Sequence, residues 1–218
     1  MKAIILVSGG MDSCVTVTMA KTEGSDLAFL HVNYGQRTKK REFQAFNAIA
    51  DYYDIRNRLV VNIPHLSDIG GSCLTDENIR VPEADLQNLD IPISYVPFRN
   101  ANILAAAVSW AEVLNAKKIY VGAVEDDSSG YPDCRRLFFD TFERTIEAGT
   151  KPETHIKIIT PLIELSKKNI VLKGVEFSAP LHLTWSCYEN EDKPCEKCDS
   201  CVLRARGFKQ AGIPDPLL

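Results

Sequence analysis

The chain has 218 residues, of which 45% are hydrophobic, and a formal net charge of −4. These values are typical of one globular domain with a full core, and the acidic total offers no basic face for nucleic acid. No apolar run is long enough to cross a membrane, and residues 1–7 are too short for a secretion signal. We therefore expect a cytoplasmic protein with neither a nucleic-acid partner nor a membrane partner.

The N-terminal residues contain the strongest local pattern. An apolar run at residues 3–7 predicts a first strand, which stops at Ser-Gly-Gly-Met-Asp-Ser, residues 8–13, and a helix is expected over residues 13–21. A glycine turn between a strand and a helix can bind an anion, because its N–H groups point inward and the helix dipole favours negative charge. The spacing matches neither a Walker loop nor a Gly-x-Gly-x-x-Gly turn. A tight turn with a Ser or Asp helix cap is the alternative interpretation.

Short β-rich runs alternate with helical patterns along the rest of the chain. Further strands are expected at residues 27–32, 59–63, 119–124 and 156–160, and further helices at 39–53, 100–114 and 135–148. This alternation predicts an α/β fold, a doubly wound and mostly parallel sheet covered on both faces. Ligands of such sheets bind beyond the carboxyl ends of the strands, where residues 8–13 would lie. Residues 64–97 are expected to form the longest irregular segment.

Four of the seven cysteines lie close together near the C-terminus: Cys187, Cys195, Cys198 and Cys201. In a cytoplasmic chain such a cluster indicates a metal site rather than disulfides. Four thiolates complete the tetrahedral shell of a structural zinc ion and leave no position for a reacting water. An iron–sulfur cluster is the rival, and His182 could replace one ligand. We favour zinc, because nothing else in the chain calls for electron transfer.

The loop at residues 8–13 resembles the PP-loop of ATP pyrophosphatases, which cleave ATP to AMP and pyrophosphate. With the cysteine cluster, the chain resembles the 7-cyano-7-deazaguanine synthase family of queuosine biosynthesis over nearly its whole length. The matching segments include residues 33–37 (Asn-Tyr-Gly-Gln-Arg), 96–100 (Val-Pro-Phe-Arg-Asn), 130–135 (Gly-Tyr-Pro-Asp-Cys-Arg), 184–188 (Thr-Trp-Ser-Cys-Tyr) and 195–208. Phe98 stands where a small residue is expected, and Thr38 where a His is common.

The resemblance implies a fold, a reaction and an assembly. The fold would be an adenine nucleotide alpha-hydrolase-like domain at residues 1–176, with a zinc-binding segment at residues 177–218 packed on it. The reaction would convert 7-carboxy-7-deazaguanine and ammonium to the nitrile with ATP and Mg²⁺. It would pass through an adenylated acid and an amide, and each activation would release pyrophosphate and AMP. The assembly would be a homodimer.

The resemblance also assigns residues to this chemistry. ATP is expected on Ser8, Gly9, Gly10, Met11, Asp12 and Ser13. Its adenine is expected on backbone groups at the end of the second strand, at His31, Asn33 and Tyr34. The substrate is expected on Arg99, Asn100, Tyr131, Asp133 and Arg135. Ser8, Asp12, Ser13 and Arg99 are expected to be catalytic, chiefly by stabilising the leaving pyrophosphate.

A purely structural role is the alternative for several of these residues. His31 could be a buried strand residue, Asn100 a helix N-cap and Asp133 a plain turn residue. Lys167 and Lys168, at an expected helix start, could reach a phosphate or be solvated.

Three other functions compete with nitrile synthesis. A sibling enzyme could stop at the amide, since the first half-reaction is the same. An ATP pyrophosphatase that activates a tRNA base would need a basic RNA-binding surface, against which the acidic total argues. A zinc-binding module without catalysis would explain the cysteines and leave residues 8–13 unexplained.

Overall fold

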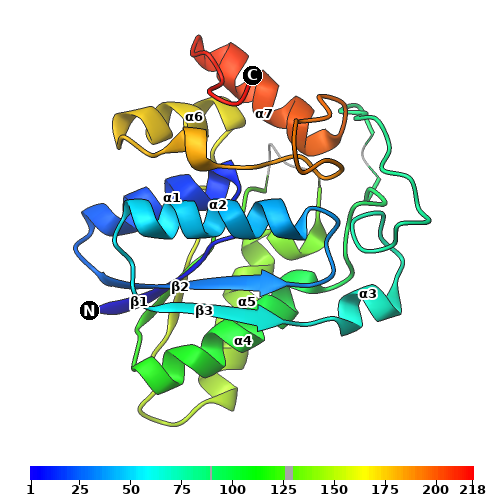
Figure 1. Ribbon diagram of the computed structural model, residues 1–218. Helices are drawn as coiled ribbons and strands as arrows, with labels where there is room; N and C mark the ends of the chain where they lie inside the picture. Colours follow the sequence, from blue (N-terminus) through cyan, green and yellow to red (C-terminus); the bar gives the residue numbers. More distant parts are fainter. Residues whose placement is uncertain (89, 126–129) are drawn as a thin grey trace.

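A five-stranded sheet runs through the middle of the computed structural model, which describes residues 1–88, 90–125 and 130–218 (Figure 1). The strand order is β3-β2-β1-β4-β5, and each neighbouring pair is parallel. The strands are β1 (Lys2–Leu6), β2 (Asp26–Asn33), β3 (Arg58–Asn62), β4 (Lys118–Tyr120) and β5 (Lys157–Ile159). The predicted doubly wound sheet is therefore confirmed.

Helices cover both faces of this sheet. They are α1 (Met11–Thr22), α2 (Lys39–Tyr52), α3 (His65–Ile69), α4 (Arg99–Leu114), α5 (Arg136–Gly149), α6 (Lys167–Glu176) and α7 (Asp199–Ala211), with short 3₁₀ turns η1 (Pro132–Cys134) and η2 (Leu181–Leu183). Successive residues of a strand point to opposite faces. Ile4 of β1 accordingly packs with α4 and α5, whereas Ile5 packs with α1 and α2. Both residues are fully buried, which explains why β1 is a continuous apolar run.

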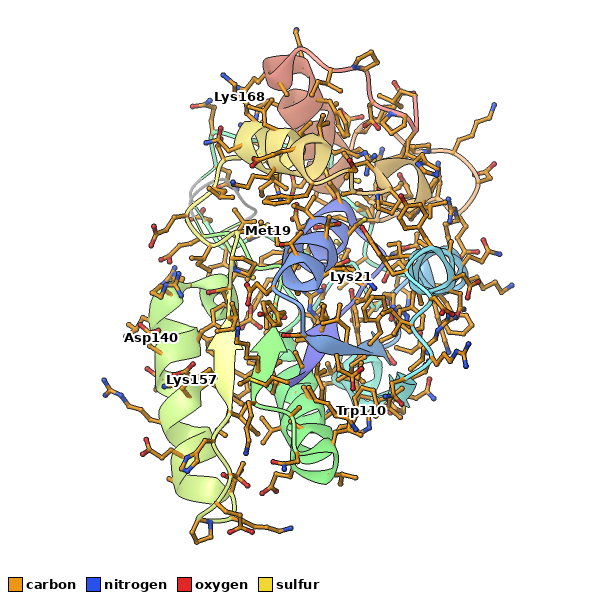
Figure 2. The ribbon with its side chains drawn as sticks, turned by 90° about the vertical axis from the view of Figure 1, so that its left-hand side faces the viewer. Met19, Lys21, Trp110, Asp140, Lys157 and Lys168 are labelled. Carbon is orange, nitrogen blue, oxygen red and sulfur yellow. The ribbon has the colours of Figure 1, made fainter. Side chains whose placement is uncertain are left out.

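Helices α6 and α7 form an additional layer outside α1. Figure 2 shows Lys168 in this outer layer, with Met19 and Lys21 of α1 beneath it and Asp140 of α5 beyond the sheet. Ile170 of α6 and Phe208 of α7 pack in one apolar cluster with Val15 of α1. In the described part of the chain, no helix combines the length and apolar character that crossing a membrane requires.

The predicted element boundaries differ from the observed ones where the chain approaches the carboxyl edge of the sheet. A strand was expected to reach residue 124, but β4 ends at Tyr120. The chain leaves the sheet at Gly122, where a Cβ would lie 2.9 Å from the backbone carbon of Asp12. Helix α1 begins at Met11 rather than at residue 13. The consequence is that Asp12 lies within the first turn of α1, directly beside this bend.

The segment 64–97 is mainly irregular, as predicted, apart from the short helix α3; residue 89 lies outside the described residues. Arg37, which follows β2, ties the segment to the domain. Its guanidinium donates to the backbone oxygens of Cys73 (2.6 Å), Asp76 (2.7 Å) and Ile79 (2.6 Å). A single arginine thus supplements the few backbone hydrogen bonds that this segment makes, such as the one from the Cys73 N–H to the Ile93 oxygen at 3.0 Å.

Gly9 allows the loop after β1 to approach α2 closely. Its φ is +94°, and a Cβ at this position would lie 2.6 Å from the backbone oxygen of Glu42 and 2.9 Å from the Cβ of Ala45. On the loop's other side, the backbone N–H of Trp185 donates to the Gly9 oxygen at 2.9 Å. The loop therefore lies between α2 and the segment that contains Trp185.

Substituting Gly9→Ala should destabilise the protein by about 3 kcal/mol, because the new methyl group meets both a positive φ and two backbone or Cβ contacts. Gly24→Ala is the matched control, since Gly24 has a φ of +74° and no heavy atom within 4 Å of the added Cβ. It should cost about 1 kcal/mol. Denaturant unfolding measures both values, and equal losses would show that the close approach of Gly9 has no energetic weight.

Candidate active site

A cavity of about 290 Å³ lies at the carboxyl edge of the sheet. Its apolar floor consists of residues at the ends of β1, β2 and β4, among them Leu6, Leu30 and Val121. The strand order reverses between β1 and β4. Open α/β sheets bind their ligands at this switch point. The cavity's volume is at the lower end of the range for small-molecule sites.

One end of the cavity is built by the loop after β1. The Ser8 hydroxyl accepts from the Gly10 N–H (3.2 Å) and donates to the Ser13 hydroxyl (3.3 Å). The Ser13 hydroxyl in turn donates to the Gly10 oxygen at 2.9 Å. Gly10 is the N-cap of α1 and supplies no side chain to the N–H groups of the first turn. The N-terminus of α1 is therefore available to an anion in the cavity.

Lys167, at the start of α6, brings a cation to this end. Its Nζ lies 2.6 Å from Asp12 Oδ2, and the two side chains are 10% and 27% exposed. Both residues line the cavity. Asp12 Oδ1 is buried without a hydrogen-bond partner among the described residues. This pair thus offers an ammonium to phosphate-type anions and a carboxylate oxygen to a cation.

Another part of the cavity lining contains Arg99 beside two tyrosines. Its Nη1 donates to the Tyr34 hydroxyl at 3.1 Å, and its guanidinium lies 5.0 Å from the Tyr34 ring centre and 5.8 Å from that of Tyr131. Burial raises the pKa of Tyr34 to about 12, so the hydroxyl stays neutral beside the guanidinium. Tyr188 also lines the cavity. A guanidinium among neutral partners is suited to a ligand carboxylate or phosphate.

Glu42, in the first turn of α2, is a second carboxylate in the cavity wall. Its Oε1 accepts from the Thr38 hydroxyl (2.8 Å) and its Oε2 from Gln36 Nε2 (3.0 Å). Burial raises the pKa of Glu42 to about 7. The sequence analysis missed this residue, because a glutamate on the polar side of a surface helix has no distinguishing pattern.

The structure brings most of the expected site residues to this cavity, and sequence reasoning missed several others. Expected residues that line it are Ser8, Gly10, Met11, Asp12, Ser13, Tyr34, Arg99, Asn100 and Tyr131. Lining residues that were missed or assigned no site role include Glu42, Cys134, Trp185, Ser186, Tyr188 and Arg204. Lys167 was weighed as a phosphate contact and does line the cavity. Trp185 and Tyr188 lie in a segment quoted for the family resemblance, which is the signal that could have found them.

Gly9, His31, Asn33, Asp133 and Arg135 do not line the cavity. His31 is buried between β2 and α2, where its Nδ1 lies 2.9 Å from the Val7 oxygen, and burial lowers its pKa. The Asn33 amide donates to Asn62 of β3 at 3.0 Å. Arg135 is exposed.

Asp133 joins two segments of the site. Its Oδ2 accepts from the backbone N–H of Asn100 (2.9 Å), and its backbone oxygen accepts from the Asn100 side-chain amide (2.8 Å). The N-cap of α4 is Phe98, with a left-handed φ of +56°, so Asn100 is not the cap. Asp133 supplies the capping acceptor from a distant loop and thereby fixes the helix turn that carries Arg99.

The sulfur atoms of Cys187, Cys195, Cys198 and Cys201 all lie within 4.8 Å of one another, so the cluster could hold a metal ion. Backbone N–H groups of Asn190 and Cys195 donate to Cys187 Sγ, both at 3.3 Å. Such N–H donors stabilise thiolates that bind metals. His182 is not part of the cluster. Since Cys187 also lines the cavity, the cluster borders the site.

The remaining cysteines are not activated thiols. Burial raises the pKa of Cys14 to about 12 and that of Cys134 to about 11. Burial also raises the pKa of Cys73. These thiols therefore stay protonated near neutral pH, which argues against a thiolate nucleophile.

Comparison with known proteins places the chain in a family. The family model described as "Queuosine biosynthesis protein QueC" matches residues 2–212. A 7-cyano-7-deazaguanine synthase from Chlorobium phaeobacteroides (strain DSM 266) is 58% identical over 217 residues, covering 100% of this chain and 96% of the relative. A 7-cyano-7-deazaguanine synthase from Chlorobaculum tepidum is 57% identical with the same coverage. The chain therefore belongs to the QueC family.

Two more distant solved structures share the fold. A predicted subunit of a tRNA methyltransferase from Methanocaldococcus jannaschii superposes with a TM-score of 0.52 and 15% identity, covering 99% of this chain and 90% of that one. A 4-thiouridine synthetase, in complex with RNA and with bound ATP, gives a TM-score of 0.54 at 17% identity, covering 97% of this chain and 50% of the other. The fold is thus the adenine nucleotide alpha-hydrolase-like one.

If the N-terminus of α1 binds pyrophosphate, substituting Lys167→Met should weaken that binding about tenfold or more, because it removes an ammonium and leaves the Asp12 carboxylate unpaired there. Lys168→Met is the matched control, since Lys168 is exposed on the same helix turn. Titration calorimetry measures both affinities. If both variants bound pyrophosphate as tightly as the unmodified protein, the anion site would have to lie elsewhere.

Proposed function

We propose that this member of the QueC family converts 7-carboxy-7-deazaguanine, ammonium and ATP to 7-cyano-7-deazaguanine, AMP and pyrophosphate. The observation that carries the proposal is the arrangement of charge within one cavity. The N-terminus of α1 and Lys167 offer positive charge to an anion in one part of the lining, and Arg99 lies beside Tyr34 and Tyr131 in another. Such a cavity accommodates the phosphates of ATP together with a second, carboxylate-bearing substrate.

The chemistry explains why ATP is needed twice. A carboxylate becomes a nitrile only after each oxygen has been made a leaving group. The substrate carboxylate attacks the α-phosphate of ATP, pyrophosphate leaves, and ammonia displaces AMP from the acyl adenylate to give the amide. A second ATP activates the amide oxygen, and elimination of AMP gives the nitrile.

The loop at the end of β1 would stabilise the pyrophosphate that leaves in each activation. Ser8 and Ser13 would donate hydroxyl hydrogen bonds, Met11 its backbone N–H group, and Lys167 its ammonium. Asp12 fits a Mg²⁺ ion, because its Oδ1 is buried without a hydrogen-bond partner in the described structure. Bound there, Mg²⁺ would neutralise phosphate charge.

The floor of the cavity and the part of its lining near Arg99 would receive the two organic groups. We place adenine against Leu30 and Val32, which line the cavity, rather than against the side chains of His31 and Asn33, which lie on the other face of β2. The substrate carboxylate would pair with Arg99. The planar deazaguanine ring would lie among Tyr34, Tyr131 and Tyr188, while Asp133 holds Asn100 in place.

The wider setting is also part of the proposal. We infer a nucleotide-binding domain at residues 1–176 that carries a metal-binding segment at 177–218, in a cytoplasmic homodimer without a nucleic-acid partner. Reduced, clustered thiols suit the cytoplasm. A dimer is supported by exposed apolar side chains near the starts of α4 and α5: Phe98 is 60% exposed and Leu137 is 74% exposed.

Incubation of the purified protein with 7-carboxy-7-deazaguanine, ATP, Mg²⁺ and ammonium should yield the nitrile with AMP, as read by mass spectrometry. Ser8→Ala should slow turnover by about 10²-fold, because it removes a hydroxyl that contacts developing charge. Ser109→Ala, at an exposed site on α4, should leave turnover unchanged. Amide without nitrile would replace the proposal with the shorter sibling reaction, and absence of AMP would refute adenylation.

We further propose that the four clustered cysteines bind one structural Zn²⁺ per chain, because thiolates are the ligands that zinc prefers in closed sites. Cys198→Ser should lose the metal and lower Tm by about 10 °C. Cys134→Ser, outside the cluster, should retain it. Elemental analysis measures zinc, and visible absorption by an iron–sulfur chromophore would contradict the assignment.

A further inference from the structure

Glu42 is a carboxylate of the cavity wall to which the proposed reaction assigns no role. Its backbone oxygen lies 2.6 Å from the position that a Cβ of Gly9 would take, so the first turn of α2 adjoins the loop at residues 8–13. Its side chain lines the same cavity as Asp12 and Arg99. Asp12 is engaged by Lys167, whereas no ion pair within 4.0 Å is found for Glu42 in the described part of the structure.

Neutral donors hold the Glu42 carboxylate in one orientation. Thr38 donates to Oε1 and Gln36 to Oε2, so each oxygen keeps further capacity to accept a proton. The titratable groups that influence it are Arg99 from α4, Glu191 from the C-terminal segment and Tyr34 after β2. Burial outweighs the two hydrogen bonds and Arg99, so the pKa of Glu42 rises to about 7.

We propose that Glu42 is the general base that takes protons from the reacting nitrogen; this inference rests on the proposed function. In amide formation, nitrogen bonds to the carbonyl carbon, one N–H proton passes to Glu42, and the C–O bond to AMP breaks. In nitrile formation, adenylation of the amide oxygen leaves a C=NH group and releases the first N–H proton to Glu42. The last N–H proton then passes to Glu42 while AMP leaves with the electrons of its C–O bond. Glu42 then returns each proton to solvent.

The position of Glu42 relative to Arg99 supports this role. Arg99 would hold the carboxyl group whose carbon the nitrogen attacks, and Glu42 interacts electrostatically with that same guanidinium. A nitrogen that enters beside Arg99 therefore lies next to a carboxylate that neutral hydrogen bonds have already oriented. A base is most effective when its pKa lies near the working pH, as that of Glu42 does.

The test separates adenylation from nitrogen transfer in Glu42→Gln, which keeps the size of the side chain. Exchange of labelled pyrophosphate into ATP, with 7-carboxy-7-deazaguanine and without ammonium, measures adenylation and should stay within about threefold of the unmodified protein. Amide formation from ammonium should fall by about 10²–10⁴-fold. Hydroxylamine is less basic than ammonia, so its adduct loses the N–H proton to water more readily and depends less on Glu42; hydroxamate formation should therefore fall much less than amide formation. Glu147→Gln, an exposed glutamate on α5, is the matched control and should change none of these rates.

Parallel loss of exchange and amide formation in Glu42→Gln would overturn the proposal, because it would assign Glu42 to binding or folding. The proposal would be overturned equally if Glu42→Gln kept both the exchange rate and the rate of amide formation of the unmodified protein. Absence of exchange in the unmodified protein would instead refute the proposed function.

Thr38→Val provides a second, independent test of the proposal if Glu42→Gln does not fold. The Thr38 hydrogen bond stabilises the charged carboxylate, so its loss raises the pKa of Glu42 further. The ratio of the rate of amide formation to the rate of exchange should rise with pH to a plateau, with a midpoint near 7 where Glu42 loses its proton. In Thr38→Val that midpoint should move to higher pH. The ionisation of ammonium affects both proteins equally, so it does not contribute to the difference between them. A midpoint that did not move would contradict the assignment.

Discussion

The site depends on the close approach of the loop after β1 to helix α2. Gly9 has no side chain, so its backbone can lie against Glu42 and Ala45 while its oxygen accepts from Trp185. This one contact joins three walls of the cavity, namely the loop, the first turn of α2 and the segment of residues 184–188. A side chain at residue 9 would separate them, and the anion end of the cavity would lose its relation to Glu42.

Charge in the cavity is compensated by two different means. Asp12 and Lys167 form a direct ion pair, as do Arg204 and Asp215, whose side chains are 6% and 5% exposed. Arg99 donates to the neutral hydroxyl of Tyr34, and Glu42 accepts from neutral amide and hydroxyl donors. Neither Arg99 nor Glu42 has an ion-pair partner within 4.0 Å in the described part of the chain, so each charge is able to respond to a ligand. The reacting centre is therefore expected near Arg99 and Glu42, which line the same cavity.

The sequence was sufficient for the fold because alternating apolar runs and helical patterns permit few arrangements other than a parallel sheet. The loop at residues 8–13 could be placed at the edge of the sheet because those residues are contiguous and follow the first strand. The sequence does not say which face of an element meets the cavity. The side chains of His31 and Asn33 alternate with cavity-lining residues along β2, and periodicity alone does not distinguish the two faces. In the sequence, Glu42 is one of several charges on the polar side of a helix, and only the fold places it at the cavity. Asp133 has the pattern of a turn residue, and only the fold shows that it accepts from the first turn of α4.

The cysteine cluster lies close enough to the cavity that a structural metal there would also shape the site. Cys187 belongs to the cluster and lines the cavity, and Trp185 and Tyr188 of the same segment line it as well. Arg204 of α7 holds the start of this segment by donating to the Thr184 hydroxyl at 2.7 Å. The other end of the segment is held by thiols, which bind one another weakly when protonated and strongly when they share an ion. A metal at the cluster would thus fix the wall that meets Gly9, so its loss would be expected to disturb ligand binding before it unfolds the sheet.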